Sequence, residues 1–281
     1  MQSLSLIAPA KLNLFLHING RRNDGYHELE TLFVFLDHGD RLTFTLTDCD
    51  AITLVTEFDE IDVTQNLVYR AAQILLPYAT KPSGVEIILT KTLPTGGGVG
   101  GGSSDAATTL LALNKLWHCN LSNNQLAELG VKLGADVPVF VRGYAAIAQG
   151  IGEKLTSVEV PSQWYLVVHP NVHVSTQVVF THPDLPRNTA KLSGDWKYEN
   201  LANDCEPLVK KLYSEVEKTL KWLLKYGPSR MTGTGACCFV SFNNEQDAQF
   251  ALSQLPSCWQ GFVAKSTTIS PAHLELAGKL N

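Results

Sequence analysis

Residues 96–102 hold six glycines in seven positions and run directly into helix-forming residues, "SSDAATTLLALNKLW". Glycine-rich segments are usually linkers, but a linker does not normally continue into a helix with an apolar face. Apolar residues recur after these glycines at offsets of four, seven and eleven, which predicts a helix with one apolar side. They are Ala106, Leu110, Leu113 and Trp117. The sequence therefore predicts a flexible loop attached to a buried helix.

A bare backbone at the start of a helix favours binding of a phosphate group. The first N–H groups of a helix have no partner within it, and the helix dipole adds about half a positive charge at that end. Glycine matters because any Cβ would hold the phosphates away. We expect Ser103 and Ser104, at the junction, to cap the helix, or to donate to phosphate oxygens or to a magnesium-bound position.

Two nucleotide-binding motifs can be compared with this loop. Gly96, Gly98 and Gly101 satisfy G-x-G-x-x-G, but the dinucleotide fingerprint also needs an acidic residue about 20 positions further on. Around residue 121 the chain reads "HCNLSNNQ". A P-loop needs Gly-Lys-Ser/Thr after the glycines, and this is missing. We therefore expect another kind of phosphate-binding loop, with a nicotinamide-dependent oxidoreductase as an alternative.

Length and composition indicate the class of protein. A chain of 281 residues with 44% hydrophobic residues suits two domains of ordinary size. The net charge of −5 argues against a nucleic-acid partner, which needs a basic face. No run approaches the roughly 18 apolar residues of a membrane span, the start of the chain lacks a signal-peptide pattern, and the six cysteines show no C-x-x-C spacing. We expect a cytoplasmic protein with no membrane partner.

Strands and helices alternate in the first half of the chain. Residues 10–18 alternate apolar with polar side chains, which predicts a strand with one polar face. Residues 29–36 and 40–47 are predicted as two further strands, and 84–93 as a strand leading into the glycines. A helix over 66–76 has Asn66 as its N-cap, and another is expected to begin at Ser122 and to stop at Gly134.

From about residue 156 the pattern changes. Strands are predicted at residues 164–170, 237–242 and 261–269, with a long amphipathic helix over 200–226 and a shorter one over 244–255. This alternation predicts a compact α+β unit with its helices on one face of a sheet.

Four segments resemble the superfamily of galactose, homoserine, mevalonate and phosphomevalonate kinases. "LPTGGGVGGGSSDAA" resembles its phosphate loop, and "TGTGACCFV" (232–240) resembles its C-terminal glycine motif. Within it, "PAKLNLFLHINGRRNDGYHELETLF" and "GADVPVFVRGYAAIAQGIGE" are similar to the 4-diphosphocytidyl-2-C-methyl-D-erythritol kinases, which act in the non-mevalonate isoprenoid pathway. The resemblance runs from about residue 8 to about residue 271.

The resemblance implies a fold and an activity. The fold is α+β, a two-domain small-molecule kinase fold in which residues 1–155 form the N-terminal nucleotide-binding and catalytic domain. Residues 156–281 form a C-terminal ferredoxin-like α/β-sandwich domain that binds the substrate. The implied reaction is ATP-dependent phosphorylation of the 2-hydroxyl of a substrate that carries a cytidine diphosphate group. Mg²⁺ accompanies the ATP, and the sequence indicates neither its ligands nor the oligomeric state. The alternatives are another kinase of the superfamily, such as a homoserine or mevalonate kinase, or a non-catalytic metabolite-binding protein.

Site residues follow from the same resemblance. It implies Asp136 beside the acceptor hydroxyl as a base or orienting group, with Lys11 next to both. Tyr26 and Phe180 enclose the cytosine, while His27 reads its edge. The methylerythritol end is contacted by Asn13, and Asn66 and Lys91 lie near the adenine. The rest of the ATP site is Pro94, Thr95, Gly96, Gly97, Gly98, Val99, Gly100, Gly101, Gly102, Ser103 and Ser104. Asp105 stands where the superfamily often has a small neutral residue.

Overall fold

A computed structural model describes residues 2–56, 62–81, 83–193, 197 and 201–278. The strands it assigns are β1 (Ser3–Arg21), β2 (His27–Thr47), β3 (Ile52–Thr56), β4 (Gly84–Thr90), β5 (Ala146–Gly150), β6 (Lys154–Ser157), β7 (Trp164–His169), β8 (Arg230–Met231), β9 (Cys238–Phe242) and β10 (Gln260–Thr267). The α-helices are α1 (Leu67–Leu75), α2 (Gly101–Leu116), α3 (Asn123–Val131), α4 (Val137–Arg142), α5 (Thr176–Thr181), α6 (Glu206–Leu212), α7 (Ser214–Leu223), α8 (Glu245–Ser253) and α9 (Pro271–Gly278). Short 3₁₀ turns lie at Val63–Gln65 and Leu76–Tyr78.

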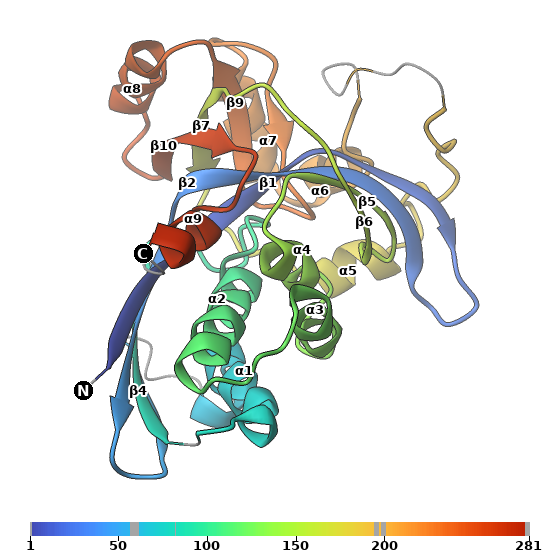
Figure 1. Cartoon of the computed structure of the whole chain (residues 1–281). Helices are drawn as coiled ribbons and strands as arrows, with labels where there is room; N and C mark the ends of the chain where they lie inside the picture. Colours follow the sequence, from blue (N-terminus) through green and yellow to red (C-terminus); the bar gives the residue numbers. More distant parts are fainter. Residues whose placement is uncertain (1, 57–61, 82, 194–196, 198–200, 279–281) are drawn as a thin grey trace.

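Two long antiparallel strands, β1 and β2, form the framework of the N-terminal half (Figure 1). Strand β2 also pairs with β4 and β5, and β3 lies parallel to β4 at the sheet edge. Helices α1 to α4 lie together on one side of these strands (Figure 1). Their apolar side chains form one core with alternate residues of the strands, including Leu6, Phe35 and Phe44.

The C-terminal half has its own sheet, in the order β10-β7-β9-β8, with every pair antiparallel. Numbered along the chain, this order is 4-1-3-2, which together with the intervening helices is the ferredoxin-like β-α-β-β-α-β arrangement. Leu166 and Val240 pack with α7 and α8 in one cluster, so both helices cover the same face, as the sequence predicted. On the opposite face, Tyr165 and Phe239 pack against residues of β1 and β2. The two-domain α+β fold is confirmed.

The C-terminal segment returns to the N-terminal half. Ser266 and Thr267 of β10 pair with β2, which joins the two sheets. Helix α9 packs beside β1, where Glu275 accepts a hydrogen bond from the Ile7 N–H and pairs with Arg41. The family-implied boundary at residue 155 falls inside β6.

Two local expectations were wrong in detail. The two strands expected at 29–36 and 40–47 are one strand, β2, because the turn-like residues between them remain extended. The helix expected over 200–226 is two helices, α6 and α7, since Tyr213 leaves the helical region at φ −130°, ψ 93°; residue 200 lies outside the described residues. The strand with one polar face predicted over residues 10–18 is part of β1, and α2 and the glycine loop bury that face.

Helix α2 differs from its expected form in two ways. It begins at Gly101, with Gly100 at the N-cap in the left-handed region (φ 77°), so Ser103 and Ser104 lie inside the helix and cap nothing. Its burial is also not one-sided: Ala107 and Ala112 on its other faces are as fully buried as Leu110. The helix therefore passes through the core of the N-terminal half.

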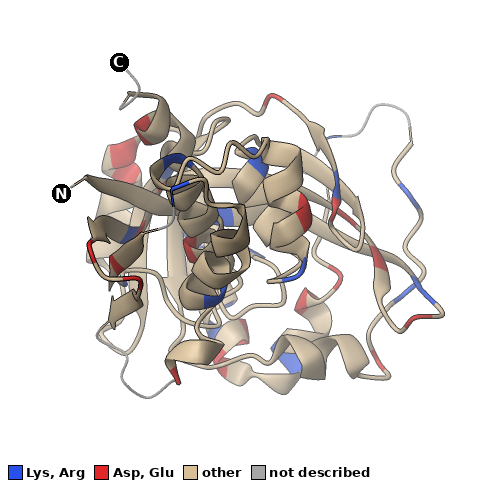
Figure 2. Ribbon diagram, turned by 60° about the horizontal axis from the view of Figure 1, so that its bottom comes forward, with Lys and Arg blue, Asp and Glu red and all other residues tan. Residues whose placement is uncertain are grey.

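Acidic and basic residues are interspersed along the chain (Figure 2). All six cysteines are free thiols, four of them buried. Among the described residues, none of the helices has the length and hydropathy needed to span a membrane.

Candidate active site

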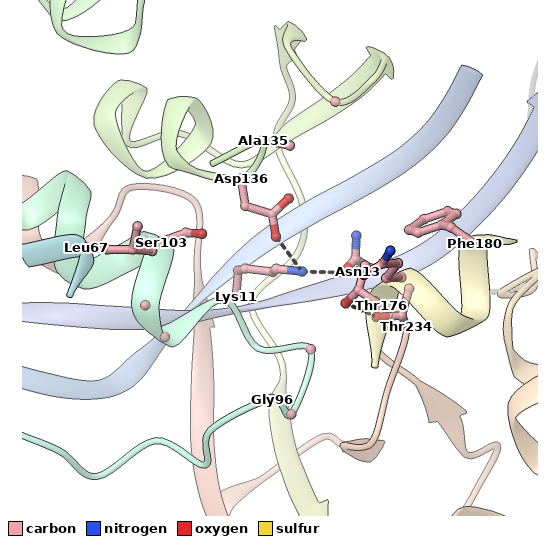
Figure 3. A pocket seen from close by; sticks show the side chains of 18 of the residues that line it. Lys11, Asn13, Leu67, Gly96, Ser103, Ala135, Asp136, Thr176, Phe180 and Thr234 are labelled. Atoms are coloured by element: carbon pink, nitrogen blue, oxygen red, sulfur yellow. Dashed lines mark hydrogen bonds and ion pairs between the residues drawn. The ribbon is translucent and has the colours of Figure 1, made fainter. Parts of the chain in front are cut away.

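A cavity of about 1000 Å³ opens between the glycine loop, the paired strands β1 and β2, and helix α5. Its walls come from both halves of the chain. The residues predicted for catalysis and for binding the acceptor substrate all line it: Lys11, Asn13, Tyr26, His27, Asp136 and Phe180. Figure 3 shows the side chains of Lys11 and Asn13 on β1, Asp136 at the start of α4 and Phe180 on α5 around this cavity. A volume of this size suits a bound small molecule or nucleotide.

The glycine loop forms one wall of the cavity. Of the thirteen residues predicted to bind ATP, all but Val99 and Ser104 line the cavity. Both exceptions are fully buried: Val99 packs in the core beneath the loop, and Ser104 lies on a covered face of α2. Gly96, Gly98 and Gly100 all have positive φ, between 68° and 77°. The loop thus adopts a backbone that glycine permits at little cost.

Lys11 and Asp136 meet inside the cavity. Lys11 lies on β1 just after a break in the β1–β2 register, and such irregularities re-aim side chains. Its Nζ donates to Asn13 Oδ1 at 2.6 Å and lies 3.3 Å from Asp136 Oδ2 (Figure 3). Lys11 is almost completely buried, with 3% of its side chain exposed, whereas Asp136 is 36% exposed. A cation held by a carboxylate and an amide in this way can orient both groups toward a bound hydroxyl.

The backbone around Asp136 leaves its carboxylate free for this contact. Asp136 occupies the N-cap position of α4, but its side chain makes no capping hydrogen bond. Pro138 stands in the first turn, where its missing N–H removes one group that a cap would satisfy. The alternative that Asp136 serves as an ordinary helix cap is therefore not supported.

Residues of the C-terminal glycine motif (232–240) hydrogen bond to the glycine loop on the side away from the cavity. Thr232 Oγ1 accepts from the Asn13 N–H at 3.0 Å and lies 3.4 Å from the Gly98 carbonyl oxygen. The Cys237 N–H donates to the Gly97 carbonyl at 3.0 Å. The main-chain carbonyls of the loop are thereby held on the protein side, while the face lined by the glycines remains open to the cavity.

Lys91, Asp40 and Asp105 form a buried triad beneath the start of α2. The ammonium of Lys91 pairs with Asp40 Oδ2 and donates to Asp105 Oδ2 at 2.8 Å. Asp40 Oδ1 accepts from the N–H groups of Thr92 and Leu93, which lead into the glycine loop. Sequence reasoning placed Lys91 near the adenine and left Asp105 unexplained, whereas the structure joins both through Asp40.

Two carboxylates share one ammonium in this triad, so the negative charges outnumber the positive one. Burial and this imbalance together shift the pKa values of Asp105 and Lys91. Burial raises the pKa of Asp105 to about 7; Lys91 opposes this and Asp40 adds to it. Burial by itself would lower the pKa of Lys91, but Asp105 and Asp40 outweigh it and the pKa is raised. Asp105 Oδ1 is buried and has no hydrogen-bond partner among the described residues. The triad can hold a proton near neutral pH.

Aromatic side chains shape the far end of the cavity. Tyr26 is 59% exposed and stands at the end of the turn that precedes β2. The rings of His27 and Phe180 lie 5.1 Å apart with an interplanar angle of 30°. Phe180 is only partly buried and lines the cavity from α5, so it is not simply a core aromatic.

Sequence reasoning did not identify several polar residues of this region. Thr176 and Thr234 line the cavity and hydrogen bond to each other at 2.9 Å; Thr234 lay in a quoted motif, but nothing in the sequence marked Thr176. Thr31 accepts from Asn13 Nδ2 at 2.8 Å. Asp40 and Arg187 stand in unremarkable local sequence, so only their tertiary contacts could reveal them.

This chain is similar to known kinases. The family description "GHMP kinases N terminal domain" matches residues 66–144, and "GHMP kinases C terminal" matches residues 181–261. The 4-diphosphocytidyl-2-C-methyl-D-erythritol kinase of Pseudoalteromonas translucida is 62% identical and covers 98% of this chain and 97% of its own length. The same enzyme of Tolumonas auensis is 56% identical, with the same coverage of both chains.

Solved structures give the same picture. A crystal structure of 4-(cytidine 5'-diphospho)-2C-methyl-D-erythritol kinase superimposes with a TM-score of 0.80 at 32% identity, covering 94% of this chain and 99% of that one. Homoserine kinase from Cytophaga hutchinsonii, at 18% identity, shares the fold with a TM-score of 0.66 and covers 96% of each chain. The identities and coverage together show that the chain belongs to the 4-diphosphocytidyl-2-C-methyl-D-erythritol kinase family of the GHMP kinases.

Proposed function

We propose that this chain transfers the γ-phosphoryl group of ATP to the 2-hydroxyl of 4-diphosphocytidyl-2-C-methyl-D-erythritol, a step of the non-mevalonate isoprenoid pathway. The observation that carries the proposal is the Lys11–Asp136 pair, which faces a glycine-lined cavity at the start of α2. A homoserine or mevalonate kinase would share the phosphate loop, but it would have no use for the aromatic end formed by Tyr26, His27 and Phe180.

Phosphoryl transfer requires positioning and charge stabilisation more than covalent chemistry by the protein. In the proposed reaction the substrate oxygen forms a bond to the γ-phosphorus, and the bond from that phosphorus to the β,γ-bridging oxygen breaks, releasing ADP. The hydroxyl proton passes to the Asp136 carboxylate. Lys11, held between Asp136 and Asn13, orients the hydroxyl and offsets the negative charge that develops nearby.

The phosphate chain of ATP is proposed to lie along the residues from Pro94 to Ser103. Open main-chain N–H groups and the positive end of the 16-residue helix α2 favour an anion there. Asn66 and Lys91 line the same cavity and would approach the adenine. Asn66 also caps α1 by accepting from the Val68 N–H, so its position is fixed.

Mg²⁺ would accompany the nucleotide and neutralise charge on its phosphates. Among the described residues, no group of three or more His, Cys, Asp or Glu side chains is placed to hold a metal ion. Mg²⁺ usually keeps several water ligands and is held by one or two carboxylates together with phosphate oxygens of the substrate. A site of that kind needs no larger cluster of protein ligands.

The two domains would have different roles in the reaction. We propose that residues 1–155 bind ATP and supply Lys11 and Asp136, and that residues 156–281 add the cytidyl-binding wall through Phe180. The cavity is lined from both parts, so each part would be incomplete without the other.

The test is ADP release with 4-diphosphocytidyl-2-C-methylerythritol and Mg²⁺, compared with homoserine, mevalonate and galactose. The proposal expects release only with the cytidyl substrate. ATP, and not NAD, should raise the melting temperature, since a ligand that binds the native state stabilises it. Turnover of homoserine or mevalonate in preference to the cytidyl substrate would refute the assignment.

A further inference from the structure

Strand β1 has a bulge beside the cavity. Between Asn13 and Leu16 its register with β2 shifts by one residue, so β1 carries one extra residue there. The Phe15 carbonyl, inside this bulge, accepts a hydrogen bond from the hydroxyl of Thr31 on β2. A threonine hydroxyl has a single hydrogen and two lone pairs. Thr31 therefore gives its one hydrogen to the backbone and can only accept from another neighbour.

The neighbour from which Thr31 accepts is the side-chain carboxamide of Asn13. Asn13 Nδ2 donates to Thr31 Oγ1 at 2.8 Å, and Asn13 Oδ1 accepts from Lys11 Nζ at 2.6 Å. If the carboxamide were turned over, its NH₂ group would face an ammonium that can only donate. Its oxygen would then face a hydroxyl whose hydrogen is already used. Thr31 and Lys11 thus require the same orientation of Asn13.

These three side chains are closed off from solvent, although all of them contribute to the cavity wall. Lys11, Asn13 and Thr31 are each 2% exposed. Thr232 holds the main chain of Asn13, because its Oγ1 accepts from the Asn13 N–H at 3.0 Å, but Nδ2 has Thr31 as its partner. A buried polar group that loses its partner is costly, so removing the Thr31 hydroxyl should release the carboxamide from this orientation.

We infer that Thr31 is a positioning residue for phosphoryl transfer, because it orients the Asn13 carboxamide so that its oxygen holds the Lys11 ammonium. That ammonium lies 3.3 Å from Asp136 Oδ2, where the substrate hydroxyl is proposed to react. A lysine ammonium is a compact charge on a flexible stem, so a second acceptor is needed to fix its position. The effect on the reaction rests on the proposed function, but the orientation of the carboxamide does not.

The first experiment measures this orientation without any substrate. Nitrogen-15 NMR of asparagine-labelled protein follows solvent exchange of the side-chain NH₂ hydrogens, and Asn13→Asp assigns the signal. The wild type and Thr31→Ser should protect the Asn13 NH₂ group from exchange. Thr31→Val cannot accept a hydrogen bond, so its exchange should be about tenfold faster.

Two results of this measurement would overturn the inference. One is an Asn13 NH₂ group that exchanges in the wild type as fast as an exposed asparagine. The other is equal protection in the wild type and in Thr31→Val. The wild-type spectrum decides the first point even if Thr31→Val does not fold.

The second experiment measures ADP release with the cytidyl substrate. Thr31→Val should lower kcat by about tenfold, the effect of one hydrogen bond in a charged network, while KM for ATP stays as in the wild type. Thr31→Ser keeps the hydroxyl and should recover most of the turnover. An unchanged kcat in Thr31→Val, or an equal loss in Thr31→Ser, would refute the role of the hydroxyl.

A double-mutant cycle tests whether Thr31 acts through Asn13. In the Asn13→Ala background there is no carboxamide to orient, so adding Thr31→Val should lower single-turnover rates by less than about twofold, which is the error of additivity for independent sites. A further tenfold loss in the double variant would mean that Thr31 acts on the substrate or on Lys11 without Asn13. That result would overturn the inference.

Thr219→Val is the matched control. Thr219 is also fully buried, and its hydroxyl donates to the Glu215 carbonyl at 2.8 Å within α7, away from the residues that line the cavity. This variant should lose stability but keep the wild-type kcat. A loss of kcat as large as in Thr31→Val would attribute the effect to stability and refute the positioning role. A wild type that released no ADP with the cytidyl substrate would refute the proposed function, while the NMR measurement would still decide the orientation of Asn13.

Discussion

Lys11 Nζ lies 3.3 Å from Asp136 Oδ2, although the two residues are far apart along the chain. The contact joins the buried strand β1 to the residue that opens α4. Because Asn13 accepts a second hydrogen bond from the same ammonium, Lys11 is fixed on two sides. Asp136 remains more than a third exposed on the cavity side, where a substrate hydroxyl can reach it.

Replacing Asp136 by Asn should lower turnover by at least about 100-fold, the lower range for loss of a positioned base. The amide keeps the shape of the carboxylate but cannot take the hydroxyl proton. KM for ATP should remain close to that of the wild type, because the glycine loop is untouched. Steady-state ADP release measures both values. Near-normal turnover would remove Asp136 from the proposed mechanism.

Removing the ring of Tyr26 in Tyr26→Ala should raise KM for the cytidyl substrate by roughly 5- to 100-fold. Stacking of a base on an aromatic side chain contributes about 1–3 kcal/mol, and the exposed ring is available for it. KM for ATP should not change. Phe250→Ala is the control, since it removes another exposed aromatic ring, on α8, that does not line the cavity. Equal kinetic effects in both variants would contradict the stacking assignment.

Asp105→Asn should change how stability depends on pH. The folded pKa of Asp105, about 7, lies above its ordinary value of 3.8, so the folded state binds its proton more tightly than the unfolded state does. The resulting stabilisation is complete below about pH 4 and is lost as pH rises to about 7. An amide cannot lose this proton, so the variant should gain stability relative to the wild type across that window.

Urea unfolding of both proteins at pH 4.5, 6 and 8 measures this difference. Asp62→Asn is a suitable control, because Asp62 is an exposed carboxylate whose pKa is lowered by hydrogen bonds from Thr64. Its effect should be nearly constant from pH 4.5 to 8, because a carboxylate with a lowered pKa is ionised in both the folded and the unfolded state over this range. A pH-independent difference for Asp105→Asn would show that Asp105 is ionised throughout.

Gly98→Ala should destabilise the fold by roughly 1–3 kcal/mol, since φ at Gly98 is 75° and the new Cβ would meet the carbonyl oxygen of Thr232. KM for ATP should also rise, because the loop must move. Gly152→Ala is the matched control: its φ is also positive, at 108°, but a Cβ there meets no atom within 4 Å. Urea unfolding should show a smaller loss for Gly152→Ala. An equal loss of stability in both variants would mean that the strained backbone, and not the contact with Thr232, destabilises Gly98→Ala.

Local sequence patterns predicted much of the fold. Helix α3 begins at Ser122 with the expected cap, reinforced by Gln125, because capping depends on residues three positions apart. The strands of the C-terminal sheet and the helices on one of its faces also follow from short-range periodicity. The glycine run before a helix predicts a phosphate site, because bare backbone in that position has few other uses, and this assignment stays a prediction.

Tertiary structure decided the rest, because burial and long-range pairing have no local signature. Alternation predicts only that Lys11 and Asn13 share one face of a strand. Tertiary structure decides that the glycine loop and α2 cover this face and that both residues line the cavity. Likewise, only folding brings Asp40 to Lys91, and Arg187 to His27. The sequence by itself determined most of the elements and predicted the phosphate loop, whereas the packing of distant segments determined which charges are buried together.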